Sequence, residues 1–117
     1  MIFGVGTDLC SVVRMQDALE RTPNLKARLF HTNEQELPNH SLAARFAAKE
    51  ALAKALGDPK LLSWSEIEIV KDELGKPSIQ LHGQTKERVM ALGISAIQVS
   101  LSHEQELASA FVVLEAN

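Results

Sequence analysis

The sequence predicts an α+β fold in which a mostly antiparallel sheet packs against one long helix and several shorter ones. Short segments rich in Val and Ile, some with alternating apolar and polar side chains, lie near both ends of the chain. The turns between the later segments are too short for helical crossovers, which indicates antiparallel pairing. The length of 117 residues, 45% of them hydrophobic, suits one compact domain over residues 1–117.

The first half of the chain is expected to hold one strand followed by helices. Residues 2–9 form a short Ile-, Phe- and Val-containing segment typical of a buried strand. Helical periodicity and stop signals then predict helices over residues 12–21, 25–30, 33–37 and 41–56. Ser11 is a suitable N-cap for the first of these helices, Asn33 with Glu36 is a candidate start for the third, and Gly57 ends the longest.

The second half is expected to be mainly strands. Apolar residues at strand spacing predict strands over residues 66–71, 79–81, 96–102 and 108–114. Residues 73–77 form a turn between the first two, and a polar loop at 103–106 joins the last two as a hairpin. A helix is expected over residues 85–92, closed by Gly93.

Composition excludes several classes of protein. The net charge of -3, from 12 basic and 15 acidic residues, gives no reason to expect nucleic acid or an anionic membrane as a partner. No stretch approaches the roughly 20 apolar residues of a membrane span, and no signal peptide precedes Asp8. The single cysteine, Cys10, cannot form an intramolecular disulfide. A cytoplasmic protein is expected.

The stretch GVGTDL, residues 4–9, combines two glycines with a carboxylate. Because side chains alternate along a strand, Gly4, Gly6 and Asp8 share one face. Glycine in a strand often marks the close approach of another backbone or of a ligand. Two interpretations follow: a helix packs tightly here and Asp8 caps the next helix, or the bare face leads to a functional carboxylate.

The long helix carries a face of small residues, namely Ala44, Ala47, Ala48, Ala51 and Ala55. Charged residues flank the opposite face. Glu50 and Lys54, one turn apart, form a plausible surface pair. Arg45 and Lys49 repel each other at the same spacing, so they are either solvated or share an anion.

Two carboxylates with several cations suggest a magnesium ion and a phosphorylated ligand, because Mg²⁺ typically takes one or two protein carboxylates plus phosphate oxygens. His103 ends an apolar strand face and is a structural residue, a phosphate contact or a proton carrier. His31, His40 and His82 show no metal-ligand spacing with each other or with Cys10, so no zinc site is expected. No Gly-x-Ser-x-Gly motif supports a hydrolase.

Four blocks taken together resemble the holo-(acyl-carrier-protein) synthases, the small bacterial phosphopantetheinyl transferases. They are GVGTDL followed by Arg14, then RFAAKEALAKALG, DELGKP, and VSLSHE followed by ASAFVV. The blocks follow one another in order along the whole chain, and residues 22–41 and 58–65 match least.

The resemblance implies transfer of the phosphopantetheine arm of coenzyme A to a serine of acyl carrier protein, with Mg²⁺, in fatty acid biosynthesis. It implies Asp8 and Glu50 as metal ligands, and these two with Lys54 as catalytic residues. The implied coenzyme A contacts are Arg45, Lys49, Lys54, Gly75, Lys76, Pro77 and His103. It also implies a homotrimer with active sites between subunits. The general base is left open between a metal-bound water, Glu50 and His103.

Residues 11–30 carry more basic than acidic side chains on an otherwise acidic chain. Such a surface would steer an acidic carrier protein toward the site. The resemblance implies Arg14 and the first helix as the docking surface, to which Arg21 and Arg28 are added here. The alternatives are a module that binds coenzyme A or a nucleotide without catalysis, and a structural oligomer.

Overall fold

The computed structural model describes all residues 1–117 and contains two antiparallel sheets. The larger sheet has the strand order β1-β5-β4, with β1 at Ile2–Ser11, β5 at Leu107–Ala116 and β4 at Ile94–Glu104. The smaller is a hairpin of β2 (Ile67–Lys71) and β3 (Pro77–Leu81). The predicted α+β class with antiparallel pairing is confirmed.

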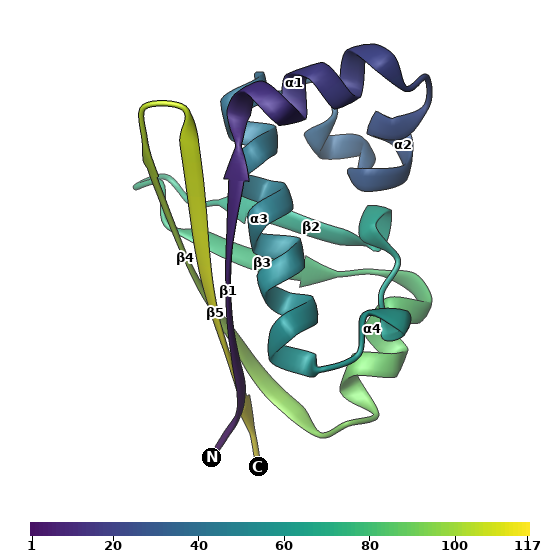
Figure 1. Ribbon diagram of the computed structural model, residues 1–117. Coiled ribbons are helices and arrows are strands. Elements are labelled where there is room, and N and C mark those ends of the chain that lie inside the picture. Colours follow the sequence, from purple (N-terminus) through teal and green to yellow (C-terminus); the bar gives the residue numbers. More distant parts are fainter.

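One long helix runs along the larger sheet, and the shorter helices lie near the two ends of this helix (Figure 1). The α-helices are α1 (Val12–Arg21), α2 (Leu25–Leu29), α3 (Asn39–Leu56) and α4 (Gly83–Met90). Three short 3₁₀ helices are η1 (Thr32–Glu34), η2 (Pro59–Leu61) and η3 (Trp64–Glu66). Both chain termini lie together at the end of the sheet opposite α1. No helix is both long enough and apolar enough to cross a membrane.

The segment between α2 and α3 differs from the expected helix over residues 33–37. It holds only the single 3₁₀ turn η1, and its N-cap is His31 rather than Asn33. The His31 Nδ1 atom accepts a hydrogen bond from the Asn33 backbone N–H at 3.1 Å, and Glu34 Oε1 accepts one from the His31 N–H at 3.0 Å. This reciprocal capping box satisfies two backbone N–H donors at the start of the turn.

The two glycines of β1 allow α3 to lie directly on the strand. A Cβ atom at Gly4 would collide with the carbonyl oxygen of Ala55. One at Gly6 would collide with the carbonyl oxygen of Ala51 and lie 2.8 Å from the Ala55 nitrogen. The close packing of a helix on the bare face of the strand is confirmed. The expected cap at Asp8 is wrong, because the N-cap of α1 is Ser11.

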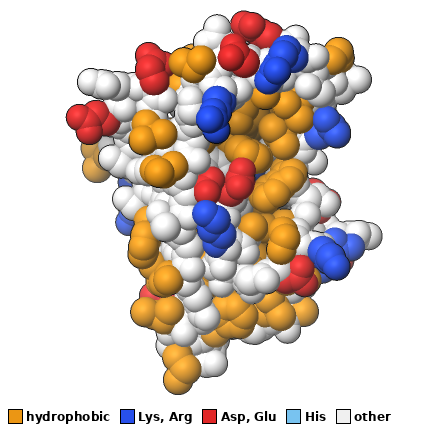
Figure 2. Space-filling view, in the orientation of Figure 1, with side chains coloured by type: hydrophobic (Ala, Val, Ile, Leu, Met, Phe, Trp, Pro, Cys, Tyr) orange, Lys and Arg blue, Asp and Glu red, His pale blue; other side chains and the backbone are white.

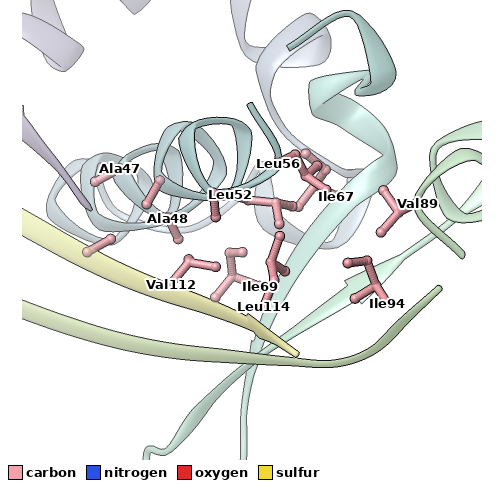
Figure 3. Close-up of a cluster of buried hydrophobic side chains, with 13 residues drawn as sticks. Ala47, Ala48, Leu52, Leu56, Ile67, Ile69, Val89, Ile94, Val112 and Leu114 are labelled. Carbon is pink, nitrogen blue, oxygen red and sulfur yellow. The ribbon is translucent and has the colours of Figure 1, made fainter. Parts of the chain in front are cut away.

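The main core lies between α3, the inner face of the larger sheet, β2 and α4 (Figure 3). It contains Ala47, Ala48, Ala51, Leu52, Ala55, Leu56, Ile67, Ile69, Val89, Ile94, Ala110, Val112 and Leu114. A second cluster lies under α1 and α2 and contains Met15, Phe30, Leu42, Ala43, Ala44 and Ala108. Cys10 packs against both clusters, which joins them at the end of β1.

A buried ion pair links η1 to α3. The Glu34 and Lys49 side chains are 1% and 0% exposed, and Lys49 Nζ lies 2.6 Å from Glu34 Oε1. Lys49 also donates to the carbonyl oxygens of Leu29 at 2.8 Å and Trp64 at 3.1 Å, so all three of its N–H bonds are used. Arg45 Nε lies 3.9 Å from Glu34 Oε2. The anion that Arg45 and Lys49 share is therefore the Glu34 carboxylate.

Gly6→Ala is expected to destabilise the protein by about 3 kcal/mol or more, because the added methyl group meets helix backbone that has no room to move aside. The change in the free energy of unfolding can be measured by urea denaturation followed by circular dichroism. Ser78→Ala, at an exposed position of β3, is the control and should leave stability nearly unchanged. Equal stability of the two variants would contradict the close approach of the α3 backbone to β1.

Glu34→Gln is expected to cost roughly 3–5 kcal/mol, because it leaves the buried Lys49 ammonium without a compensating charge. Burial already lowers the pKa of Lys49, and Glu34 opposes that effect. Thermal and urea unfolding measure the loss, with the exposed Glu36→Gln as the matched control. In the double variant with Lys49→Met, the two losses should be less than additive; strict additivity would show that the pair is not coupled.

Candidate active site

Asp8 and Glu50 approach each other where α3 crosses the end of β1. The Asp8 side chain is 14% exposed, and its Oδ1 lies 2.8 Å from Lys54 Nζ. Lys54 also donates to the carbonyl oxygen of Thr7 at 3.0 Å. Glu50 lies one turn before Lys54 on α3 and is partly buried. Figure 2 shows adjacent acidic side chains with a basic one beside them near the middle of this face.

The electrostatics of the site show that the two carboxylates interact. Burial and the Asp8 charge raise the pKa of Glu50, and Lys54 only partly offsets them. Burial, with Glu50 and Asp8, also raises the pKa of the Cys10 thiol to about 11. The Cys10 thiol therefore stays protonated near neutral pH, which does not suit a nucleophile.

The pair of carboxylates fits a hard divalent cation. Both offer oxygen ligands, and a second positive charge would relieve the repulsion that raises the pKa of Glu50. The expected surface pair of Glu50 with Lys54 is wrong: Lys54 forms its ion pair with Asp8, and Glu50 forms none. Glu50 is therefore free to bind a metal ion.

An open hollow of about 370 Å³ adjoins Glu50 and Lys54. Its other lining residues come from the end of α3 and from η2 and η3, namely Ala53, Gly57, Pro59 and Trp64. A ligand in this hollow would reach a carboxylate and an exposed ammonium at once. This arrangement suits a phosphate group that shares a metal ion with the protein.

His103 and the Gly75-Lys76-Pro77 turn do not contact Asp8 or Glu50 within one chain. In the register of the sheet, Asp8 pairs with Ala110 while His103 pairs with Ala108, two strands away from β1. This spacing corresponds to about 12 Å between the Cα positions of Asp8 and His103 on the same sheet face. The turn is held by Asp72 Oδ1, which accepts from the Lys76 N–H at 2.9 Å.

Lys49 corrects the predicted set of coenzyme A contacts. Its side chain is fully buried and all its donors are used inside the protein, so no atom is left for a ligand in this structure. Arg45 is 7% exposed, and its Nε donates to the carbonyl oxygen of Ile69. Sequence reasoning missed Glu34, the partner of both cations. The only signal was the unexplained repulsion between Arg45 and Lys49.

The predicted docking arginines are exposed on two helices that contact each other. Arg14 and Arg21 are exposed on α1, and Arg28 is exposed on α2. Arg21 Nε donates to the Asp17 carbonyl oxygen at 3.4 Å, whereas Arg14 and Arg28 form no ion pair. Because α1 follows β1 directly, this basic surface begins only a few residues after Asp8.

Comparison with known proteins identifies the family of this chain. Residues 4–112 match the model of the 4'-phosphopantetheinyl transferase superfamily. A holo-[acyl-carrier-protein] synthase of Clavibacter michiganensis subsp. michiganensis is 50% identical over 115 residues, which cover 98% of this chain and 97% of the relative.

Solved structures of the same enzyme share the fold. The synthase of Neisseria meningitidis is 35% identical with a TM-score of 0.90, over 98% of this chain and 99% of that one. The synthase of Helicobacter pylori, solved in complex with coenzyme A, is 31% identical with a TM-score of 0.82, over 95% of this chain and 99% of that one. The sequence blocks, the antiparallel fold and these matches agree, and the chain therefore belongs to the holo-(acyl-carrier-protein) synthase family of the 4'-phosphopantetheinyl transferase superfamily.

Proposed function

We propose that this chain, acting as a single domain over residues 1–117, transfers the 4'-phosphopantetheine arm of coenzyme A to a serine of acyl carrier protein. The names of the relatives and the coenzyme A complex of the Helicobacter pylori enzyme support this substrate pair. The observation that carries the proposal is the approach of Asp8 and Glu50 beside the exposed Lys54. The proposed setting is fatty acid biosynthesis in the cytoplasm.

In the proposed reaction, the serine oxygen forms a bond to the phosphorus that carries the pantetheine arm. The bond from this phosphorus to the bridging oxygen breaks, and adenosine 3',5'-bisphosphate leaves with the electron pair. Asp8 and Glu50 would hold Mg²⁺, which when bound neutralises charge on the diphosphate oxygens. Glu50 and His103 are the two side chains proposed to accept the serine proton.

Lys54 is placed to bind a phosphate oxygen. Two of its three N–H bonds point to Asp8 and Thr7, which fixes the ammonium and leaves one donor for a ligand. The hydrogen bond and charge of Asp8 raise the pKa of Lys54, so it stays positive at neutral pH. The remaining coenzyme A contacts proposed from the resemblance are Arg45, Gly75, Lys76, Pro77 and His103.

A homotrimer with active sites between subunits is part of the proposal. The face of the larger sheet opposite α3 exposes apolar side chains of β1 and β5, namely Phe3, Val5, Leu9, Leu107 and Phe111. Exposed apolar patches of this kind mark association surfaces. Since one chain keeps His103 and Lys76 apart from Asp8, a neighbouring copy can supply them across the interface.

Asp8→Asn and Glu50→Gln are each expected to lower transfer by about 100-fold or more, because each removes one charged ligand of the proposed Mg²⁺. The assay is mass spectrometry of an apo-carrier protein incubated with coenzyme A, MgCl₂ and the enzyme. Glu87→Gln, on the exposed face of α4, is the control for loss of a carboxylate. If the wild-type protein binds coenzyme A but adds no mass to the carrier, the binding-module alternative holds instead.

Arg14→Ala is expected to raise KM for the carrier protein by several-fold at low salt and to leave kcat nearly unchanged, because Arg14 steers an acidic partner. The difference in KM between Arg14→Ala and wild type should decrease as the salt concentration increases. Steady-state kinetics at two ionic strengths test this, with Arg88→Ala on α4 as the matched control. An equal effect of both variants would remove α1 from the docking surface.

A further inference from the structure

We propose that His31, Glu68 and His82 form a second metal site, selective for Zn²⁺ or a similar transition metal ion. The three residues come from three separate elements: the N-cap of η1, the second residue of β2 and the N-cap of α4. The spacing of the histidines along the sequence gave no sign of this site, because the fold alone brings them together. The site is independent of the proposed transferase function.

The geometry places one ligand atom from each residue within 4.8 Å of the others. His82 Nε2 lies 2.9 Å from Glu68 Oε1, and His31 Nδ1 lies 3.8 Å from the same oxygen. The two imidazole rings stack with their centroids 4.6 Å apart. One carboxylate oxygen therefore faces two ring nitrogens, with the three elements held by the surrounding fold.

Asn33 orients the carboxylate for this role. Its side-chain amide donates to Glu68 Oε2 at 3.1 Å, which leaves Oε1 for the histidines. Glu68 is 7% exposed, and its two carboxylate oxygens have separate hydrogen-bond partners, Asn33 and His82. A carboxylate held in place by a hydrogen bond from a neighbouring side chain is typical of metal sites.

The donor set indicates which ion is bound. Two imidazole nitrogens and one carboxylate oxygen are the ligands of zinc sites that keep a fourth position for water. Imidazole suits Zn²⁺ and similar ions, whereas Mg²⁺ prefers oxygen ligands such as Asp8 and Glu50. The two sites therefore select different ions.

Small side-chain movements would complete the coordination. Ligand atoms around tetrahedral Zn²⁺ lie about 3.4 Å apart. The histidine nitrogens lie 2.9 and 3.8 Å from Glu68 Oε1, and all three ligand atoms lie within 4.8 Å of one another. The His82 side chain is 41% exposed and has room to turn. His31 would exchange its hydrogen bond from the Asn33 N–H for a metal bond, and Asn33 is exposed, so water can accept that N–H instead.

The experiment uses the full chain, treated with EDTA and then titrated with ZnCl₂ by calorimetry in excess MgCl₂. We expect binding of one Zn²⁺ per chain and a higher melting temperature. Substitution of Co²⁺ should give the visible absorption bands of a four-coordinate site. His31→Thr, which keeps an N-cap oxygen, and His82→Gln should each weaken Zn²⁺ binding by at least about 100-fold.

Two controls separate this site from other sources of binding. The ring centroids of His40 and His103 lie 6.4 Å apart, so these residues form a second pair of histidines. The His40→Gln variant removes one of them and should bind Zn²⁺ as the wild-type protein does. Asp8→Asn should also retain Zn²⁺. The proposal is overturned if wild type takes up no Zn²⁺, if folded His31→Thr and His82→Gln bind it normally, or if Asp8→Asn abolishes binding.

Discussion

The contact of α3 with the bare face of β1 is the constraint on which the rest of the structure depends. Gly4 and Gly6 let the helix backbone lie on the strand, where any side chain would collide with Ala51 or Ala55. Asp8 on β1 and Glu50 on α3 lie at one end of this contact. A helix displaced by the width of one methyl group would separate the carboxylates, so backbone packing sets the geometry of the site.

A second constraint is the buried carboxylate of Glu34, which organises the side of α3 away from β1. It accepts hydrogen bonds from Lys49 and from the backbone N–H groups of His31 and Ile69, and so connects η1, α3 and β2. An ion pair this deeply buried contributes mainly by fixing one arrangement of its elements rather than by net stability. The position of α2, and with it part of the basic surface, follows from that arrangement.

The two faces of the larger sheet have different surroundings. The inner face is covered by α3 and carries Asp8, whereas the outer face of β1 and β5 leaves apolar side chains exposed. Such a division suits the proposed association of copies, because an interface on the outer face would remove these apolar side chains from water. Helix α1 directly follows the strand that carries Asp8, so the proposed docking surface begins next to the proposed site.

The sequence by itself determined the features that depend on local periodicity. Alternation along β1 put Gly4, Gly6 and Asp8 on one face, and helical spacing put the alanines of α3 on another, because periods of two and 3.6 residues are set by the backbone. Only the tertiary structure decided the partners of the charged groups. Lys54 pairs with Asp8, 46 residues away, and Lys49 with Glu34, 15 residues away. Contacts between distant segments leave no periodic trace in the chain, so the buried role of Lys49 and the meeting of His31 with His82 became visible only in the folded protein.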